Sequence, residues 1–346
     1  DLETGKICNI PVEENAVVIR LGSFESQWIQ ISNNGTDNKI SHNSIRPEIT
    51  IPLDAEWKMK PLGKNFCRFG YVDMSLNRIE WENVEVKTFI EQCDSTKLLE
   101  KQQLRFSGAF GTPKKITPAY PLACWYRVEF QMNEVPGDIC IFMDRETMAG
   151  SYQLFINGKK ADQKDWYDVF VNDKNNQALN IYSMVKEGKN SIEIQMNIEK
   201  DEDGLRDPLY LWGSFGVTET AGIPLLTKQP ETGCPDRHWC KGFPYYSGTM
   251  EYETCMKLEI PVTEQQVNCF DIKLGFQVPT YDCIETRING VSLGVKAYTP
   301  YVWQCPRDVL QKDENIITIA VTNTLANMLD GTYFDYDSQK LVNIEP

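Results

Sequence analysis

The chain has 346 residues, of which 41% are hydrophobic and 24% are charged, so it holds enough apolar side chains for two or three ordinary domains. Its formal net charge of -14 makes nucleic acid an unfavourable partner, because an acidic surface repels phosphates. No run of about 18 apolar residues codes a membrane span, so no membrane partner is expected.

The 11 cysteines form an odd, scattered set, which argues against a complete disulfide framework. Several replace an apolar residue, as Cys140 does in the run 139–142. The cysteines therefore predict free thiols and a reducing, cytoplasmic location. Cys234, His238 and Cys240 are too few and too widely spaced for a typical zinc site, which favours a plain loop.

The first 46 residues contain two short alternating segments, at 16–21 and 28–31, followed by a polar loop. Two such strands cannot bury a core alone. We therefore expect residues 1–46 to be the trailing strands of a preceding β domain. The chain also begins without methionine, and so it is expected to be a fragment of a longer bacterial protein whose targeting signal would lie outside it.

A first unit is predicted over residues 47–228. Apolar residues alternate with polar ones over 126–132, which is typical of a strand with one buried face. The continuous apolar run 139–143 predicts a central strand, and Asn157-Gly158 predicts a hairpin turn. Other expected elements are short strands at 49–51 and 57–59, a brief helix around 97–100, and strands at 192–198 and 207–212.

A second unit, residues 229–346, repeats this order after a linker at 227–233. Residues 250–256 alternate, Asn289-Gly290 repeats the hairpin signal 132 residues after Asn157, and 315–321 forms the closing strand. Such internal similarity predicts a duplicated structural unit. Asn190 and Asn315, at the start of each closing strand, are expected to cap a turn through bonds from side chain to backbone.

The predicted fold class is all-β, with two tandem jelly-roll β-sandwiches. No stretch alternates strand and helix in the manner of a parallel α/β sheet. Each predicted unit instead consists of short strands separated by turn signals.

Several segments resemble known carbohydrate-active modules. Those of the first unit look like the galactose-binding-like, sugar-binding jelly roll of family 2-type glycoside hydrolases. Those of the second unit resemble the final sandwich of large bacterial glycosidases, including rhamnosidase-like ones. The segments are Tyr126–Phe130, Ile156–Gly158, Gly188–Ile192 and Leu211–Val217 in the first unit, and Gly242–Tyr252, Ile288–Val295, Pro300–Tyr301 and Val321–Asn327 in the second.

The resemblance implies a non-catalytic, C-terminal accessory region of a large glycoside hydrolase. Its partners would be carbohydrate and an upstream catalytic domain of the same polypeptide. No position here matches the catalytic acid or nucleophile of that family, so no catalytic residue is assigned. An autonomous, lectin-like carbohydrate-binding module is the alternative, and a small enzyme that uses loop carboxylates is a third hypothesis.

Three aromatic residues are the candidate carbohydrate contacts, because sugar C–H faces stack on rings. Trp166 follows the first Asn-Gly turn, Tyr298 follows the second, and Trp239 lies in the segment that joins the two units. The competing interpretation is that Trp166 and Trp303 fill the two cores, since duplication preserves packing more readily than a site. Trp239, alternatively, holds the two domains together.

The densest group of carboxylates lies in the polar loop 199–204. Glycoside hydrolysis needs two carboxylates, one of them with a raised pKa, and no apolar residue in this loop would raise one. The main interpretation is a solvated loop, and Ca²⁺ binding by its oxygens is a second hypothesis. No other cofactor is predicted.

Overall fold

The computed structural model describes residues 12–13, 16–17, 29, 46–99, 105–106, 113–114, 118–236, 241–260, 267–276, 282–329, 332–335 and 339–343. The chain divides into two compact units. The unit of residues 63–230, 239–247 and 325–346 contains the first sandwich, and the unit of residues 1–62, 231–238 and 248–324 contains the second. Most of the predicted preceding domain, including the segment 28–31 apart from Ile29, lies outside the described residues.

The first sandwich consists of two main sheets and a short ladder. The eight-stranded sheet contains β14 (Lys159–Lys160), β13 (Ser151–Ile156), β17 (Gly188–Ile198), β10 (Leu122–Met132), β21 (Ile223–Thr227) and β20 (Gly216–Thr220), with β6 (Tyr71–Ser75) on β10 and β7 (Glu82–Glu85) on β6. The five-stranded sheet contains β15 (Tyr167–Asp168), β16 (Asn176–Asn180), β11 (Ile139–Asp144), β19 (Leu209–Gly213) and β5 (Asn65–Phe69). A short ladder joins β12 (Met148–Ala149) to β18 (Gly204–Leu205).

The second sandwich also has one large and one small sheet. Its six-stranded sheet contains β22 (Thr232–Gly233), β4 (Trp57–Pro61), β23 (Thr249–Met256), β28 (Asn315–Thr322), β25 (Cys283–Ile288) and β26 (Val291–Lys296). Its three-stranded sheet contains β27 (Val302–Pro306), β24 (Cys269–Gly275) and β3 (Glu48–Pro52). The all-β prediction with two sandwiches is confirmed.

The helices are short, and three further strand pairs lie outside the main sheets. The helices are α1 (Phe89–Ser95), α2 (Ala326–Leu329) and the 3₁₀ turns η1 (Gln163–Asp165), η2 (Tyr182–Met184) and η3 (Arg307–Val309). The strand pairs are β1 (Val12–Glu13) with β2 (Ala16–Val17), β8 (Arg105–Phe106) with β9 (Pro113–Lys114), and β29 (Thr332–Asp335) with β30 (Lys340–Asn343). No described helix is long and apolar enough to cross a membrane.

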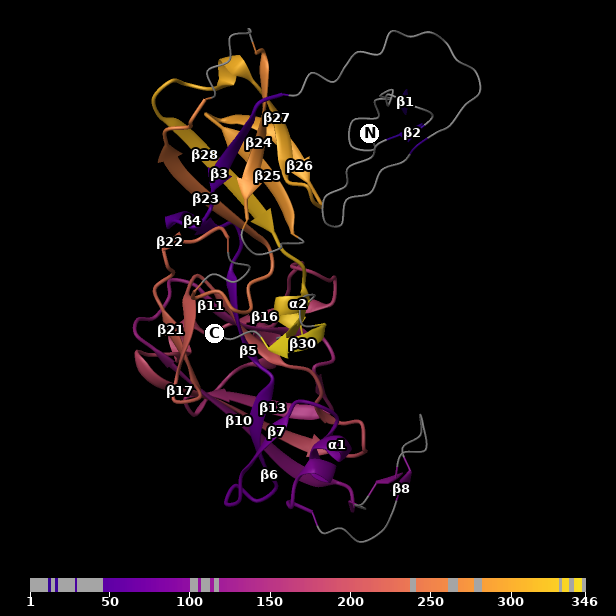
Figure 1. Cartoon of the computed structure of the whole chain (residues 1–346). Coiled ribbons are helices and arrows are strands. Elements are labelled where there is room, and N and C mark those ends of the chain that lie inside the picture. Colours follow the sequence, from indigo (N-terminus) through magenta and orange to yellow (C-terminus); the bar gives the residue numbers. More distant parts are fainter. Residues whose placement is uncertain are drawn as a thin grey trace. The chain divides into compact units, whose positions relative to one another are not determined.

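Strands β3 and β4 differ from their predicted placement. The sequence suggested that the unit beginning at residue 47 is the first sandwich, whereas β4 pairs with β23 and β3 pairs with β24. In Figure 1 the indigo β3 and β4 therefore lie among the orange and yellow strands of the second sandwich. Hydrophobic alternation within a strand identifies a buried face but not the partner strand, which explains the difference.

The duplication is visible in matching networks around the two Asn-Gly turns. Asn157 and Asn289 both have a φ of 51°. In the first sandwich the Asn157 amide donates to the Met184 carbonyl at 2.9 Å and to the Asn190 side chain at 2.8 Å, and its oxygen accepts from the Ser191 amide at 3.0 Å. Every one of these bonds has a counterpart in the second sandwich.

In the second sandwich the Asn289 amide donates to the Val309 carbonyl at 2.8 Å and to Asn315 at 2.9 Å, while its oxygen accepts from Ile316 at 2.9 Å. Asn190 and Asn315 each close a turn by bonding both backbone groups of the residue four positions earlier. The predicted capping role of these two asparagines is confirmed.

Helix α1 begins earlier than predicted. It spans Phe89–Ser95, and the expected helical stretch around 97–100 is not helical over the described residues 97–99. Its first amides are bound by the acidic loop, because Phe89 donates to the Asp203 carbonyl at 2.9 Å and Ile90 donates to the Asp201 carbonyl at 3.3 Å. Neighbouring Gly204 has a φ of 114°, and a Cβ there would lie 2.9 Å from the Tyr126 hydroxyl, so only glycine fits.

The five-stranded sheet is buried on both faces along its central strand. All residues of β11 except Asp144 are buried, as the continuous apolar run predicts. Ile141 faces the main core, whereas Phe142 belongs to a second cluster with Phe66, Tyr210 and Met328 of α2. In Figure 1 the yellow α2 lies beside the strands of this sheet.

We expect the stability of the first sandwich to fall as the pH drops below the ordinary range of an aspartate, about 4. Burial favours a higher pKa for Asp138, but the hydrogen bonds from Lys64 at 2.9 Å and from the Ser214 amide at 3.0 Å outweigh it and lower the pKa. A pKa lowered by folding stabilises the fold above the unfolded-state pKa, and this contribution disappears on acidification. Urea unfolding from pH 7 to 3 measures the effect, and Asp138→Asn should flatten the profile.

Candidate functional site

Trp166 follows η1 and lies against the main core of the first sandwich. Its side chain is half-buried, and it forms a hydrogen bond with the Tyr152 hydroxyl. Burial raises the pKa of Tyr152, and the bond to Trp166 opposes this rise. These contacts fit the interpretation of Trp166 as a packing residue, with part of its ring left accessible.

The other predicted aromatic contacts have different surroundings. Tyr298 is 42% exposed, the most accessible of the described candidates. Trp303 is buried at 3% exposure, and its indole donates to the Gly294 carbonyl at 3.0 Å, so it fills the core of the second sandwich. Trp239 lies outside the described residues. Trp166 and Tyr298 belong to different compact units.

The acidic loop 199–204 anchors α1. The loop binds the first amides of that helix through the Asp201 and Asp203 carbonyls. In addition, the Asp201 carboxylate accepts from the Tyr120 hydroxyl at 2.7 Å. The buried Asp203 carboxylate accepts from the Glu199 amide at 2.8 Å. Over the described residues, no group of three or more His, Cys, Asp or Glu side chains is placed to hold a metal ion, so the Ca²⁺ hypothesis gains no ligand set there.

The described cysteines are free thiols. Five of them are buried, as expected for small apolar side chains, and burial raises the pKa of the Cys67 and Cys124 thiols to about 12. The five are Cys67, Cys93, Cys124, Cys140 and Cys305. In the segment considered for zinc, the Cys234 thiol donates to the Leu53 carbonyl, whereas His238 and Cys240 lie outside the described residues.

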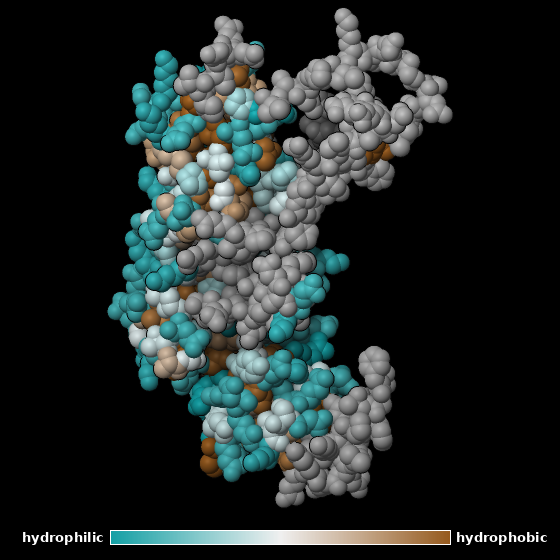
Figure 2. Space-filling view, in the orientation of Figure 1, coloured by the Kyte–Doolittle hydropathy of each residue, from teal (hydrophilic) through white to brown (hydrophobic). Residues whose placement is uncertain are grey.

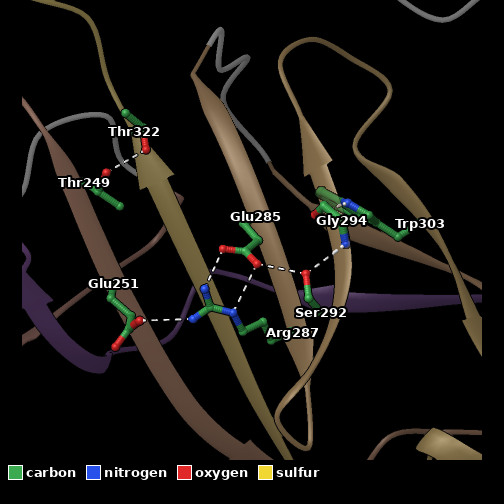
Figure 3. Close-up of polar contacts among 8 residues, drawn as sticks. All are labelled: Thr249, Glu251, Glu285, Arg287, Ser292, Gly294, Trp303 and Thr322. Carbon is green, nitrogen blue, oxygen red and sulfur yellow. Dashed lines mark hydrogen bonds and ion pairs between the residues drawn. The ribbon is translucent and has the colours of Figure 1, made fainter. Parts of the chain in front are cut away.

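A polar cluster covers the outer face of the six-stranded sheet (Figure 3). Arg287 on β25 binds Glu285 through two nitrogens, at 3.1 and 2.6 Å. Its third nitrogen lies 3.5 Å from Glu251 on β23, two strands away. Ala320 of the intervening β28 stands between Glu251 and Glu285 in the register, and its small side chain leaves room for the arginine to cross.

This cluster continues to the edge of the sheet. The Ser292 hydroxyl donates to Glu285 at 2.8 Å and accepts from the Gly294 amide at 3.2 Å. Gly294 in turn accepts the indole proton of Trp303 from the other sheet. Because both carboxylates already bind the arginine, the cluster joins three strands and ties the edge strand β26 to the second sheet. Its arrangement indicates a structural role.

Paired charges also occupy the outer face of the eight-stranded sheet. Arg127 on β10 bonds to Asp73 on β6 at 3.2 Å and stacks over the Trp81 ring, 4.2 Å from its centroid. Arg78 bonds to Glu193 on β17 at 2.9 Å. Trp81 is thus held by a cation–π contact with Arg127 and by the hydrogen bond from its indole to the Arg78 carbonyl at 3.2 Å.

One carboxyl group has the property expected of a general acid. Asp207 is the single described carboxyl whose pKa is raised, chiefly by burial and further by the nearby charge of Asp144, while Arg206 opposes the rise. Asp144 ends β11, and its carboxylate accepts from the Asn176 amide at 2.6 Å. Sequence reasoning missed this pair because Asp144 and Asp207 lie far apart in the chain and follow no motif.

No protein-family model matches the chain, and no curated protein matches it. Solved structures similar to part of the chain include a putative β-galactosidase from Bacteroides fragilis, at 14% identity and a TM-score of 0.29, where the match covers 76% of this chain and 36% of that one. They also include a glycosyl hydrolase family 2 member from Bacteroides cellulosilyticus, at 12% identity and a TM-score of 0.28, covering 77% and 31%.

A third similar structure is the exo-chitosanase of Amycolatopsis orientalis, at 9% identity and a TM-score of 0.30, with 76% of this chain and 29% of that one covered. The similar structures named here are thus glycoside hydrolases, and this chain spans about a third of their length.

Proposed function

We propose that this chain is a non-catalytic, carbohydrate-contacting accessory region of a glycoside hydrolase. The observation that carries the proposal is the duplicated asparagine network. It places the segments Ile156–Gly158 and Ile288–Gly290, which carry part of the family resemblance, at the same point of two sandwiches. The partners in this proposal are carbohydrate and the catalytic domain of the same polypeptide.

The described carboxylates support a non-catalytic role. A glycosidase needs an acid and a second carboxylate on opposite sides of a bound sugar. Asp207 has a raised pKa, but Asp144, its carboxylate neighbour, is engaged by Asn176. The other close carboxylates considered above, Glu251 and Glu285, are both bound to Arg287. Neither pair combines a raised pKa with a free partner.

We expect the purified chain to hydrolyse no p-nitrophenyl glycoside above the buffer rate. Release of p-nitrophenolate from a panel of α- and β-glycosides is the measurement. The Asp207→Asn variant is the control, because it removes the one described carboxyl with a raised pKa. Turnover by the wild-type chain that disappears in Asp207→Asn would establish the small-enzyme hypothesis instead.

Binding to a glycan array tests the carbohydrate-contacting part of the proposal. Weak binding that increases when the chain is fused to its catalytic domain is expected for an accessory region. Micromolar binding by the isolated chain, unchanged by the fusion, favours the autonomous lectin-like module. Absence of glycan binding in both forms contradicts the proposal.

A further inference from the structure

The outer face of the eight-stranded sheet carries an uncharged row of residues next to the ion pairs described above. Ser75 on β6, Trp125 on β10, Gln195 on β17 and Gln153 on β13 are cross-strand neighbours in this order. They form one continuous row across four strands. Trp125 and Gln195 are half-buried, and Gln153 is exposed. The adjacent row contains Arg127 and Glu193, whose charges are paired.

The polar groups of three residues in this row are unoccupied, whereas the fourth, the buried Ser75, accepts hydrogen bonds from the Asn77 and Arg78 backbone amides at 3.3 and 2.9 Å. Within the described part of the chain, no hydrogen bond holds the side chains of Trp125, Gln153 or Gln195. Each glutamine amide can donate and accept at the same time, and the indole N–H can donate. The row therefore combines one large aromatic ring with two free amides on a rigid sheet.

The second sandwich provides an internal comparison. Gln153 and Glu285 are equivalent, because each lies four residues before the asparagine of its Asn-Gly turn. Their partners on the next strand, Gln195 and Ala320, are then equivalent as well. The register of the following strand makes Trp125 equivalent to Glu251. In that copy the row is charged and is crossed by Arg287. The hydrogen-bond networks around the two Asn-Gly turns are the same in both copies, whereas this row differs. The shared turn network therefore does not dictate the tryptophan and the two glutamines.

We propose that the row formed by Trp125, Gln195 and Gln153 is a binding site for an uncharged glycan. This inference rests on the proposed carbohydrate-contacting function and assigns it to one sheet face. The Trp125 ring would contact the C–H face of a sugar, and the two amides would bond its hydroxyl groups, which also donate and accept. The row has no charge of its own, and the net charge of -14 disfavours an anionic ligand.

Calorimetric titration with neutral tetrasaccharides (cellotetraose, mannotetraose and β-1,4-galactotetraose) and with tetragalacturonate tests the site. We expect at least one neutral tetrasaccharide to bind, and tetragalacturonate to bind more weakly. Trp125→Ala and the double variant Gln153→Ala with Gln195→Ala should each weaken binding by about tenfold or more. Glu251→Ala, at the position equivalent to Trp125 in the other sandwich, should leave the affinity unchanged.

The possible outcomes separate this inference from the proposed function. If the glutamine variant binds as the wild type does while Tyr298→Ala or Trp166→Ala loses binding, the chain contacts carbohydrate at another place and this site is wrong. Stronger binding of tetragalacturonate also overturns it. If the wild-type chain gives no heat of binding with any of the tetrasaccharides and binds no glycan on the array, both the proposed function and this site are wrong. Because Gln153 is exposed and Gln195 is half-buried, the double variant Gln153→Ala with Gln195→Ala tests the site even if Trp125→Ala destabilises the fold.

Discussion

Replacing Asn157 by alanine should lower the free energy of unfolding of the first sandwich by about 4 kcal/mol. The substitution removes three hydrogen bonds, namely those that Asn157 donates to the Met184 carbonyl and the Asn190 side chain and the one that it accepts from the Ser191 amide. Each lost bond costs about 1 kcal/mol, and alanine is also strained at the φ of 51° found here. Urea unfolding followed by tryptophan fluorescence measures the loss.

Two variants separate the components of this effect. Asn157→Gly also removes the bonds but tolerates the positive φ, so its loss should be smaller by about 1 kcal/mol. Asn289→Ala should affect the second sandwich in the same way, because its network has matching bonds. If Asn157→Ala unfolds at the same urea concentration as the wild type, the network does not hold the turn in solution.

Local patterns in the sequence identified these turns correctly. Asn-Gly tolerates the left-handed conformation at both positions, and alternating residues on either side identify a hairpin within a few residues of chain. The buried strand β11 was recognisable for a similar reason, since a short continuous apolar run needs cover on both faces. Such signals depend only on neighbouring residues, and they therefore survive without knowledge of the tertiary fold.

Long-range features were beyond that reasoning. Trp57 and Met59 on β4 reveal a strand with a buried face, but the partner of that strand, β23, lies nearly two hundred residues later.

The start of α1, by contrast, had a local signal in the sequence, because Thr88 and Glu91 have the spacing of a capping box. In the structure Thr88 is the N-cap residue, but its hydroxyl donates to the Glu91 carboxylate and does not bind a backbone amide of the helix.

The candidate site shows the same division. Tyr298 was recognised as an aromatic residue in a loop, and it is exposed. The row of Trp125, Gln195 and Gln153 comes from three strands, and only the register brings these side chains together. Within the strand pattern, Trp125 is one of several residues that alternate with the core positions. Figure 2 shows that the described surface facing the viewer is mainly hydrophilic with scattered hydrophobic residues, so hydropathy alone does not single out a site either.

Truncating Met328 to alanine should destabilise the first sandwich by about 2–4 kcal/mol. Met328 is 2% exposed and lies in the cluster formed with Phe66, Phe142 and Tyr210 on the outer face of the five-stranded sheet. The Tyr210 hydroxyl donates to the Met328 carbonyl at 2.8 Å, and burial raises the pKa of that tyrosine to about 12. The segment that follows the second sandwich thus covers aromatic rings of the first.

Leu329 offers a matched control within the same short helix. It is 45% exposed, so Leu329→Ala should change the free energy of unfolding by less than about 0.5 kcal/mol. Tyr210→Phe removes the hydroxyl alone and should cost about 1 kcal/mol, because the Met328 carbonyl loses its donor. Urea unfolding of the three variants ranks the effects. Equal stability of Met328→Ala and Leu329→Ala would show that α2 does not rest on this sheet in solution, and that some other group covers Phe66 and Phe142.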